Sequence, residues 1–240
     1  LAGFQVVTSA AEVAANRYDQ VWITTPSDAL RGDWLPALIA ATGNATLVVF
    51  QPDPEDMQYI RDQGAQQRPL VQGIIQFSAW QSPLPHEPQH LSGITLLAPP
   101  GPCAVFDADS PHSAGIARSL AHGGLRATTR HHLAVHSARL SAVMIPLIAG
   151  LEIAGWKLAQ FAQHPMLTTA VAAAREALAA ESARAGEATP LAFRLLLNRP
   201  VTWGMLHVMP IVPGFNAEAF LAYHFSKVGQ QTRQMLATYV

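Results

Sequence analysis

Short apolar runs alternate with helix-like stretches through the first 128 residues, and this alternation restricts the fold more than any other feature. Runs rich in β-branched and aromatic residues occupy 18–25, 46–50 and 70–77, and segments with helical spacing separate them. Strand, helix, strand, helix, strand is the order of a parallel sheet covered by helices on both faces. We also expect short strands at 3–9, 94–97, 103–106 and 125–128, and helices at 10–16, 28–43, 55–63 and 110–122.

The pattern changes near Thr129. Long helical periodicity follows over 131–155, 166–185 and 217–240, with almost no strand signal. We therefore predict an α/β domain over residues 1–128 and an all-helical domain over 129–240.

Charge is scarce, at 13% of the residues, whereas the apolar residues make up 50%. Fifteen Lys and Arg against sixteen Asp and Glu give a formal net charge of −1, and no basic stripe occurs. A chain that grips the phosphate backbone needs such a stripe, so nucleic acid is excluded as a default partner.

The single cysteine, Cys103, allows neither an internal disulfide nor a thiolate metal cage, which favours a reducing compartment and a cytoplasmic protein. The strongest apolar run, 140–151, ends at Glu152 and is shorter than the ~18 residues of a membrane span. We expect a buried core helix there and no membrane partner. The chain begins at Leu1 without Met or a signal-peptide layout, as a trimmed or partly processed chain would.

Several motifs resemble the ketopantoate reductase family. The family has an apolar strand ending in Val-Lys-Ser, a helix, a strand ending in Gln-Asn-Gly or His-Asn-Gly, and a later strand with a glycine. This chain has Tyr-Asp-Gln-Val-Trp-Ile-Thr-Thr-Pro-Ser at 18–27, Thr-Leu-Val-Val-Phe-Gln-Pro-Asp at 46–53 and Val-Gln-Gly at 71–73. Ala114-Gly-Ile and Gly123-Gly-Leu before a long helix fit the second half of the family, so the resemblance spans nearly the whole chain.

The resemblance implies a Rossmann-like domain followed by a helical domain of the 6-phosphogluconate dehydrogenase-like kind. It also implies NADP-dependent oxidoreduction of a small 2-keto or 2-hydroxy acid, and a possible homodimer. The choice between NAD and NADP stays open. The family's Gly-x-Gly-x-x-Gly loop is absent from the sequence, so we expect on the order of 70 to 80 further residues upstream.

The resemblance places the cofactor-binding positions at Thr25, Pro26 and Ser27 and at Gln51 and Pro52. Pro26 stands where the family has a cofactor-facing Lys, and Pro52 where it has Asn. Proline carries no donor, so both replacements remove contacts that the family makes.

Matching the family's Trp-x-Lys-Leu-x-x-Asn helix to 137–143 places Arg139 at the catalytic Lys and Val143 at the Asn. Reduction of a ketone leaves an alkoxide that must be protonated, which a lysine can do. An arginine stabilises the alkoxide charge but is a poor proton donor. His136, within the apolar stripe of this helix, is the other candidate acid.

His132 and His136 have the i, i+4 spacing of a metal pair, but no third ligand accompanies them, so we predict no metal. In the last helix a polar row adjoins an apolar stripe: His224, Lys227, Gln231 and Gln234. We predict Lys227 as catalytic and Gln231 and Gln234 as substrate-binding. An ordinary solvated helix face is the alternative.

Two other functions stay open because the family's catalytic residues are replaced. One is a nucleotide- or metabolite-binding protein without reductase activity. The other is a helical dimerisation protein on a residual Rossmann scaffold.

Overall fold

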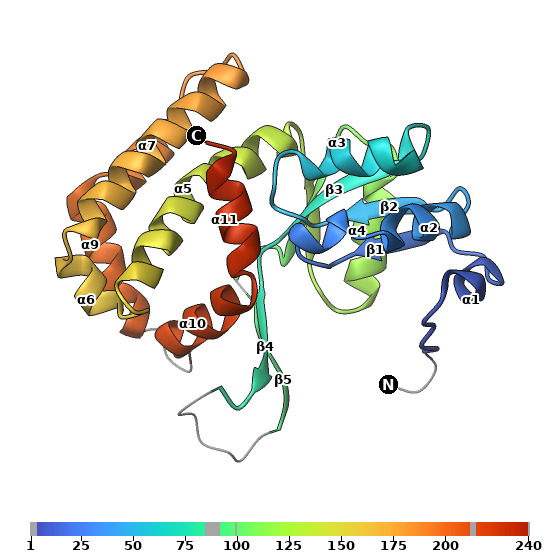
Figure 1. The fold of residues 1–240 in the computed structure, drawn as a ribbon, viewed down its shortest axis with the longest axis horizontal. Helices are drawn as coiled ribbons and strands as arrows, with labels where there is room; N and C mark the ends of the chain where they lie inside the picture. Colours follow the sequence, from blue (N-terminus) through green and yellow to red (C-terminus); the bar gives the residue numbers. More distant parts are fainter. Residues whose placement is uncertain (1–3, 85–91, 99, 212–214, 240) are drawn as a thin grey trace. The chain divides into compact units, whose positions relative to one another are not determined.

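A computed structural model describes residues 4–84, 92–98, 100–211 and 215–239 (Figure 1). The chain forms two compact units, Leu1–Gln76 with Pro100–Ala134, and Phe77–Pro99 with Val135–Val240. The segment 77–99 thus belongs to the second unit, whereas the sequence analysis assigned it to the α/β domain. Its Trp80 and Leu84 are buried in a cluster with Phe220, and this packing explains the assignment.

A five-stranded sheet forms the centre of the first unit, in the order β1 (Gln20–Ile23), β2 (Thr46–Val49), β3 (Leu70–Ile75), β6 (Ala104–Asp107) and β7 (Ala127–Arg130). β1, β2 and β3 run parallel, and so do β6 and β7. The three strands predicted to be parallel, β1, β2 and β3, are parallel. The pair β3 and β6 is antiparallel, so the sheet as a whole is mixed. Ile75 faces Ala104: the chain leaves at the end of β3 and returns beside that end, without the crossover that a parallel strand requires.

Helices cover both faces of this sheet, as predicted. Leu47 and Val49 of β2 pack in a cluster with Leu35 and Ile39 of α2 (Trp34–Ala41). Val48, between them, points to the other face and packs in a cluster with Ile116 of α4 (Ser113–His122). The remaining helical elements of the unit are α1 (Ala10–Ala14), η1 (Asp28–Arg31), α3 (Asp56–Ile60) and η2 (Arg61–Ala65).

The strand predicted at 3–9 is wrong: residues 4–9 form no strand, and Gly3 lies outside the described residues. Phe4 and Val6 are 68% and 73% exposed, and residues 4–9 belong to neither sheet of the described chain. Ser9 and Glu12 form a capping box that starts α1 instead.

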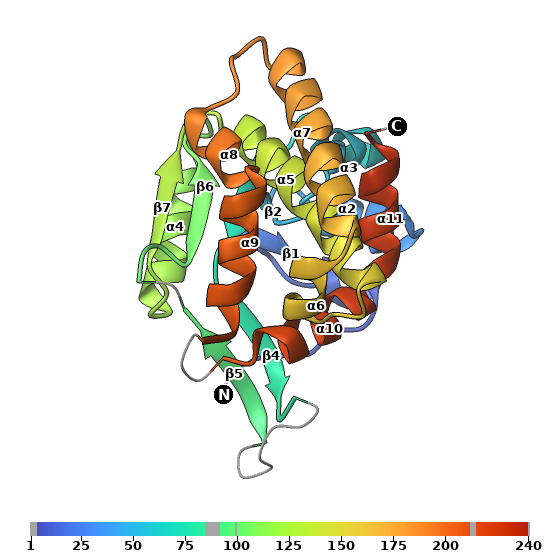
Figure 2. The same ribbon diagram turned by 90° about the vertical axis from the view of Figure 1, so that its left-hand side faces the viewer.

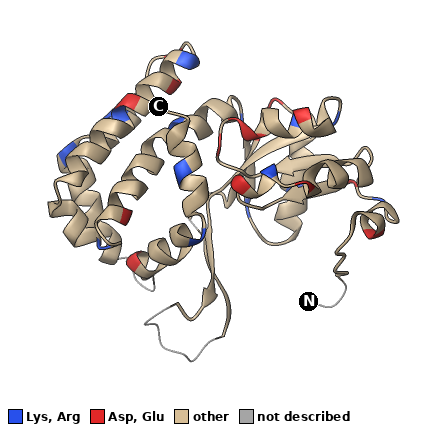
Figure 3. Cartoon of the chain, in the orientation of Figure 1, with Lys and Arg blue, Asp and Glu red and all other residues tan. Residues whose placement is uncertain are grey.

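The second unit is mainly helical, and charged residues are sparse along its helices (Figure 3). Its helices are α5 (Leu133–Ile153), α6 (Leu158–Gln163), α7 (Met166–Arg184), α8 (Leu191–Leu196), α9 (Arg199–Val208), η3 (Met209–Ile211), α10 (Ala217–Lys227) and α11 (Gly229–Ala237). An antiparallel hairpin, β4 (Ser78–Ser82) with β5 (Gly93–Leu97), completes it. The helix predicted over 217–240 breaks at Val228, next to Gly229, a residue that disfavours helix continuation.

α5 is the one helix in the described part of the chain that is long and apolar enough to cross a membrane, with a mean hydropathy of 1.5 over 18 residues. It exceeds the predicted apolar run because it begins at Leu133 and continues through Glu152. However, 61% of that window is buried, and Ala142, Val143 and Leu151 belong to the main core of the unit. A buried core helix of a globular protein meets the same criteria of length and hydropathy.

Gly150 marks a close approach between α5 and its neighbours, and α5 lies alongside α7 in both views (Figures 1 and 2). A Cβ at this position would lie 2.9 Å from the Cβ of Ala170 and from the ring of Phe161. We expect Gly150→Ala to lower the free energy of unfolding by about 1–3 kcal/mol, although Ala is the better helix former.

Gly204→Ala is the matched control, since a Cβ there, within α9, meets nothing within 4 Å. It should leave the stability unchanged or slightly higher in urea denaturation. Equal effects of the two substitutions would contradict the close approach.

Candidate functional site

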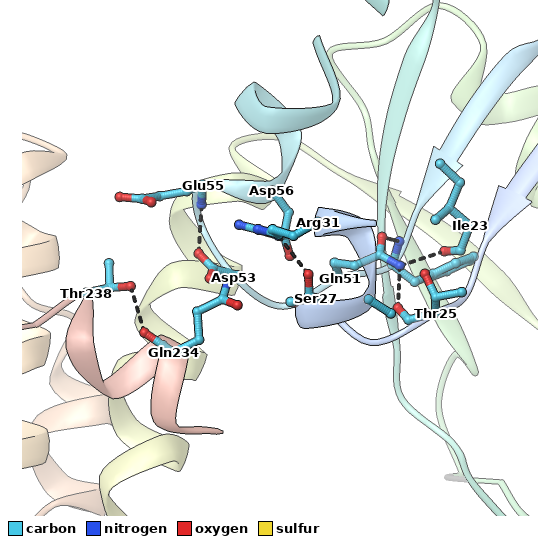
Figure 4. A network of polar contacts seen from close by, with 12 residues as sticks. Ile23, Thr25, Ser27, Arg31, Gln51, Asp53, Glu55, Asp56, Gln234 and Thr238 are labelled. Atoms are coloured by element: carbon cyan, nitrogen blue, oxygen red, sulfur yellow. Dashed lines mark hydrogen bonds and ion pairs between the residues drawn. The ribbon is translucent and has the colours of Figure 1, made fainter. Parts of the chain in front are cut away.

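The carboxyl ends of β1 and β2 meet at one edge of the sheet because the two strands are parallel. The Gln51 side chain is buried there, and its Nε2 donates to the carbonyl oxygens of Ile23 (3.1 Å) and Thr25 (2.7 Å) (Figure 4). Its Oε1 accepts from the backbone N–H of Phe50 at 3.1 Å. Gln51 therefore joins the two loops, and these contacts use both its amide donors.

An ion pair between the partly exposed Arg31 and the fully buried Asp56 fixes the loop that follows β1. Ser27 and Asp56 are fully buried, and Arg31 donates to the carbonyl of Ser27 at 2.8 Å while it pairs with the carboxylate of Asp56 (Figure 4). Burial raises the pKa of the Asp56 carboxyl, although Ser27 and Arg31 act to lower it. The guanidinium of Arg31 also lies 4.5 Å from the ring centroid of Tyr59.

The structure separates the five predicted cofactor positions into two groups. Thr25 and Pro26 are exposed and Pro52 is partly exposed, whereas Ser27 and Gln51 are buried and take part in the contacts above. Exposed backbone and side-chain groups at the ends of parallel strands are where α/β folds bind ligands. Thr25 and Pro26 are therefore the members of the set that a ligand could reach directly.

A nicotinamide nucleotide also needs a cradle for its pyrophosphate. Glycines in a strand-to-helix turn let the backbone approach phosphates closely. Among the residues described, the turns 24–27, 50–55 and 108–112 contain no glycine. These three turns therefore lack the glycine cradle for a pyrophosphate, and Thr25 and Pro26 are exposed at this edge of the sheet.

Arg139 is the most deeply buried of the predicted catalytic residues. It lies on α5, is 6% exposed, and its Nη1 is 3.0 Å from Oε2 of Glu187. Its Nε and Nη2 are buried and have no hydrogen-bond partner in the described part of the chain. A buried donor without a partner costs free energy, and a bound carboxylate or developing oxyanion would satisfy both N–H groups.

His136 lies on the same helix three residues before Arg139, a spacing that makes the two side chains neighbours on the helix surface. The residue is half-buried, and its ring centroid is 6.1 Å from that of Phe193. The first turns of α5 thus bring together two of the three predicted catalytic residues.

The third, Lys227, ends α10, and its Nζ lies 3.4 Å from the ring centroid of Tyr223. It lines a cavity whose lining includes neither Arg139 nor His136. Gln231 and Gln234 lie on α11 and are partly buried, so the break at Val228 divides the predicted polar row between two helices. No group of three or more His, Cys, Asp or Glu able to hold a metal occurs among the described residues.

Comparison with known proteins rests on solved structures, since no family model and no curated protein matches the sequence. A PanE/ApbA family ketopantoate reductase from Ralstonia eutropha JMP134 is 14% identical, with a TM-score of 0.64, covering 95% of this chain and 77% of that one. The chain has the ketopantoate reductase fold. This confirms the predicted order, a Rossmann-like domain followed by a helical one.

Other structures share the ketopantoate reductase fold with this chain. A 2-dehydropantoate 2-reductase from Methylococcus capsulatus is 12% identical, with a TM-score of 0.54, covering 93% of this chain and 73% of that one. D-mandelate dehydrogenase in complex with NADH is 11% identical, with a TM-score of 0.58, covering 91% and 77%.

Two features of the structure were not predicted from the sequence. The pair of Arg31 and Asp56 joins residues far apart in the chain and has no local signal. Lys157 lies in the same cavity as Lys227, and the signal was available: the chain contains only these two lysines.

Proposed function

We propose that the protein is a divergent member of the ketopantoate reductase family, an NAD(P)-dependent oxidoreductase of small 2-keto or 2-hydroxy acids. The fold shared with ketopantoate reductases and with a dehydrogenase crystallised with NADH supports this class. NADP rather than NAD, a cytoplasmic location and a homodimer stay predictions.

The observation that carries the proposal is the buried guanidinium of Arg139, which keeps two N–H groups without a partner among the described residues. These donors suit the carboxylate or the carbonyl oxygen of a 2-keto acid, because a guanidinium binds such groups through paired hydrogen bonds. In a site with little water, the fixed positive charge stabilises the negative charge that develops on the oxygen. His136, its neighbour on α5, is then the proton donor.

The test measures cofactor binding and turnover separately. NADPH and NADH are titrated against the protein by fluorescence, and nucleotide oxidation is followed at the nicotinamide absorbance with pyruvate, 2-ketoisovalerate and phenylglyoxylate. We expect saturable binding and oxidation with at least one keto acid. Failure to bind either nucleotide would overturn the proposal.

A second candidate is a nucleotide- or metabolite-binding protein without reductase activity. The engagement of Ser27 and Gln51 in the protein's own contacts favours it, since these positions then have little left to offer a reacting cofactor. Binding of NADPH without oxidation across the keto-acid panel is the result that would favour this candidate over the enzyme.

A further inference from the structure

The only two lysines of the chain, Lys157 and Lys227, line the same cavity, whereas the other thirteen basic residues are arginines. The cavity lies within the second unit and has a volume of about 730 Å³. Its walls are the loop after α5, with Gly155 and Trp156, and one side of α10. Ligand pockets for small molecules have volumes of about 300–1,000 Å³, so the size suits a metabolite.

The charges around this lysine cavity are unbalanced. Nζ of Lys157 pairs with Oε2 of Glu218 at 3.0 Å, and Oε1 of Glu218 accepts the backbone N–H of Leu158 at 2.8 Å. Lys227 has no carboxylate within 4.0 Å among the residues described. The lining therefore holds two ammonium groups and one carboxylate, with Lys227 left to attract an anion.

His224 lies on α10, three residues before Lys227. Its ring packs on Phe220 and against the edge of Phe225, with centroids 5.5 and 4.8 Å away. Partial desolvation lowers the pKa of His224, and the positive charge of Lys227 lowers it further.

The cavity also offers flat and apolar surfaces. Trp156 and Tyr223 both line it, together with Ala219 and Ala222 of α10. The backbone of Trp156 has φ 63°, an unusual conformation for a residue with a bulky side chain, and its ring stacks with Phe225 at 6.3 Å. The indole is thus fixed in place at the wall of the cavity.

We propose that the lysine cavity binds a small organic anion, with its carboxylate or phosphate at the ammonium groups and its planar part against Trp156. An ammonium is a compact charge with three donors that can turn toward an anion of either geometry. Nδ2 of Asn216 and the hydroxyl of Ser226 are further polar groups of the lining. This site is separate from the proposed reductase chemistry, and its test does not depend on turnover.

The first experiment uses the low lysine count. Reductive methylation with ¹³C-formaldehyde keeps the charge and gives two lysine methyl signals, which Lys157→Arg and Lys227→Arg variants assign. Phenyl phosphate and benzoate are the probes, with inorganic phosphate and neutral benzyl alcohol as comparisons. We expect saturable shifts of both lysine signals with the aromatic anions, weaker shifts with phosphate and none with benzyl alcohol. Comparing phenyl phosphate with benzoate distinguishes a phosphate ligand from a carboxylate ligand.

The second experiment measures affinity by calorimetry on the unmodified protein. Lys227→Met should weaken binding of the preferred probe by roughly tenfold or more, since a hydrogen bond from a charged group is lost. Lys227→Arg should largely keep binding and shows that a charge change, not misfolding, is responsible. Arg233→Met on α11 is the control for loss of one positive charge outside the cavity. Absence of saturable shifts, or equal weakening by Lys227→Met and Arg233→Met, would overturn the proposal.

Discussion

Replacement of Arg139 by methionine is expected to lower kcat/KM for reduction of the preferred 2-keto acid by about 10²–10³-fold. Methionine fills similar space but removes every N–H donor, including the Nε and Nη2 groups that lack partners in the described part of the chain. Steady-state kinetics on the variant and the parent protein measure the effect. Affinity for anilino(oxo)acetate, a 2-keto acid analogue with a carboxylate, should fall with it.

Two variants separate a role in binding substrate from a role in stability. Glu187→Gln removes the charged partner of Arg139 but keeps the guanidinium, so substrate binding should persist. Arg139→Lys should restore part of the activity and add a basic limb to the pH profile of kcat/KM, because a lysine can release its proton. Unchanged kinetics in Arg139→Met, with only the melting temperature altered, would limit the residue to the ion pair with Glu187.

Replacement of Arg31 by methionine is expected to lower the free energy of unfolding by about 3–5 kcal/mol. The change leaves the carboxylate of Asp56 without its charged partner at a fully buried position. It also removes the hydrogen bond to the carbonyl of Ser27. Urea denaturation at neutral pH measures the loss.

The same variant predicts a pH dependence of definite sign. Burial already raises the pKa of the Asp56 carboxyl above its ordinary 3.8, and loss of Arg31 removes two effects that lower it. The folded state then takes up a proton more readily than the unfolded chain, so acidification favours folding at this site. The difference in the free energy of unfolding between the parent protein and Arg31→Met should therefore become smaller as the pH falls from neutral toward 4. The double variant Arg31→Met/Asp56→Asn should recover most of the stability without this pH dependence. A loss of stability in Arg31→Met that does not change with pH would show that the unpaired Asp56 carboxylate is not its cause.

Local sequence patterns predicted the elements whose partners are close in the chain. The run 46–49 is apolar on both faces, which is typical of a central parallel strand, and β2 occupies that position. The strand β4, by contrast, reads Ser-Ala-Trp-Gln-Ser and has one buried residue, Trp80. Trp80 packs against Phe220, which lies far along the chain, so no local sequence pattern predicts this strand.

In the candidate site, too, features with a local sequence signal were predicted, and features that depend on distant contacts were not. Helical spacing and the family resemblance singled out Arg139 and His136, and both lie at the start of α5. Burial of the guanidinium and its pairing with Glu187 depend on how distant helices pack, which the sequence alone does not show. Gln51 was predicted at a cofactor position, but its amide joins two loops of the sheet instead, a contact that needs both strands in place.

The assignment of the hairpin to the second unit affects the order in which the protein can fold on the ribosome. Trp80 is synthesised about 140 residues before Phe220, the ring against which it packs. At elongation rates of about 5–20 residues per second, Phe220 is synthesised roughly 7–28 s after Trp80. The α/β unit can close its sheet during that interval, because β6 and β7 emerge soon after the hairpin. The nascent chain must therefore keep an apolar segment from associating with other chains until its last helices leave the tunnel.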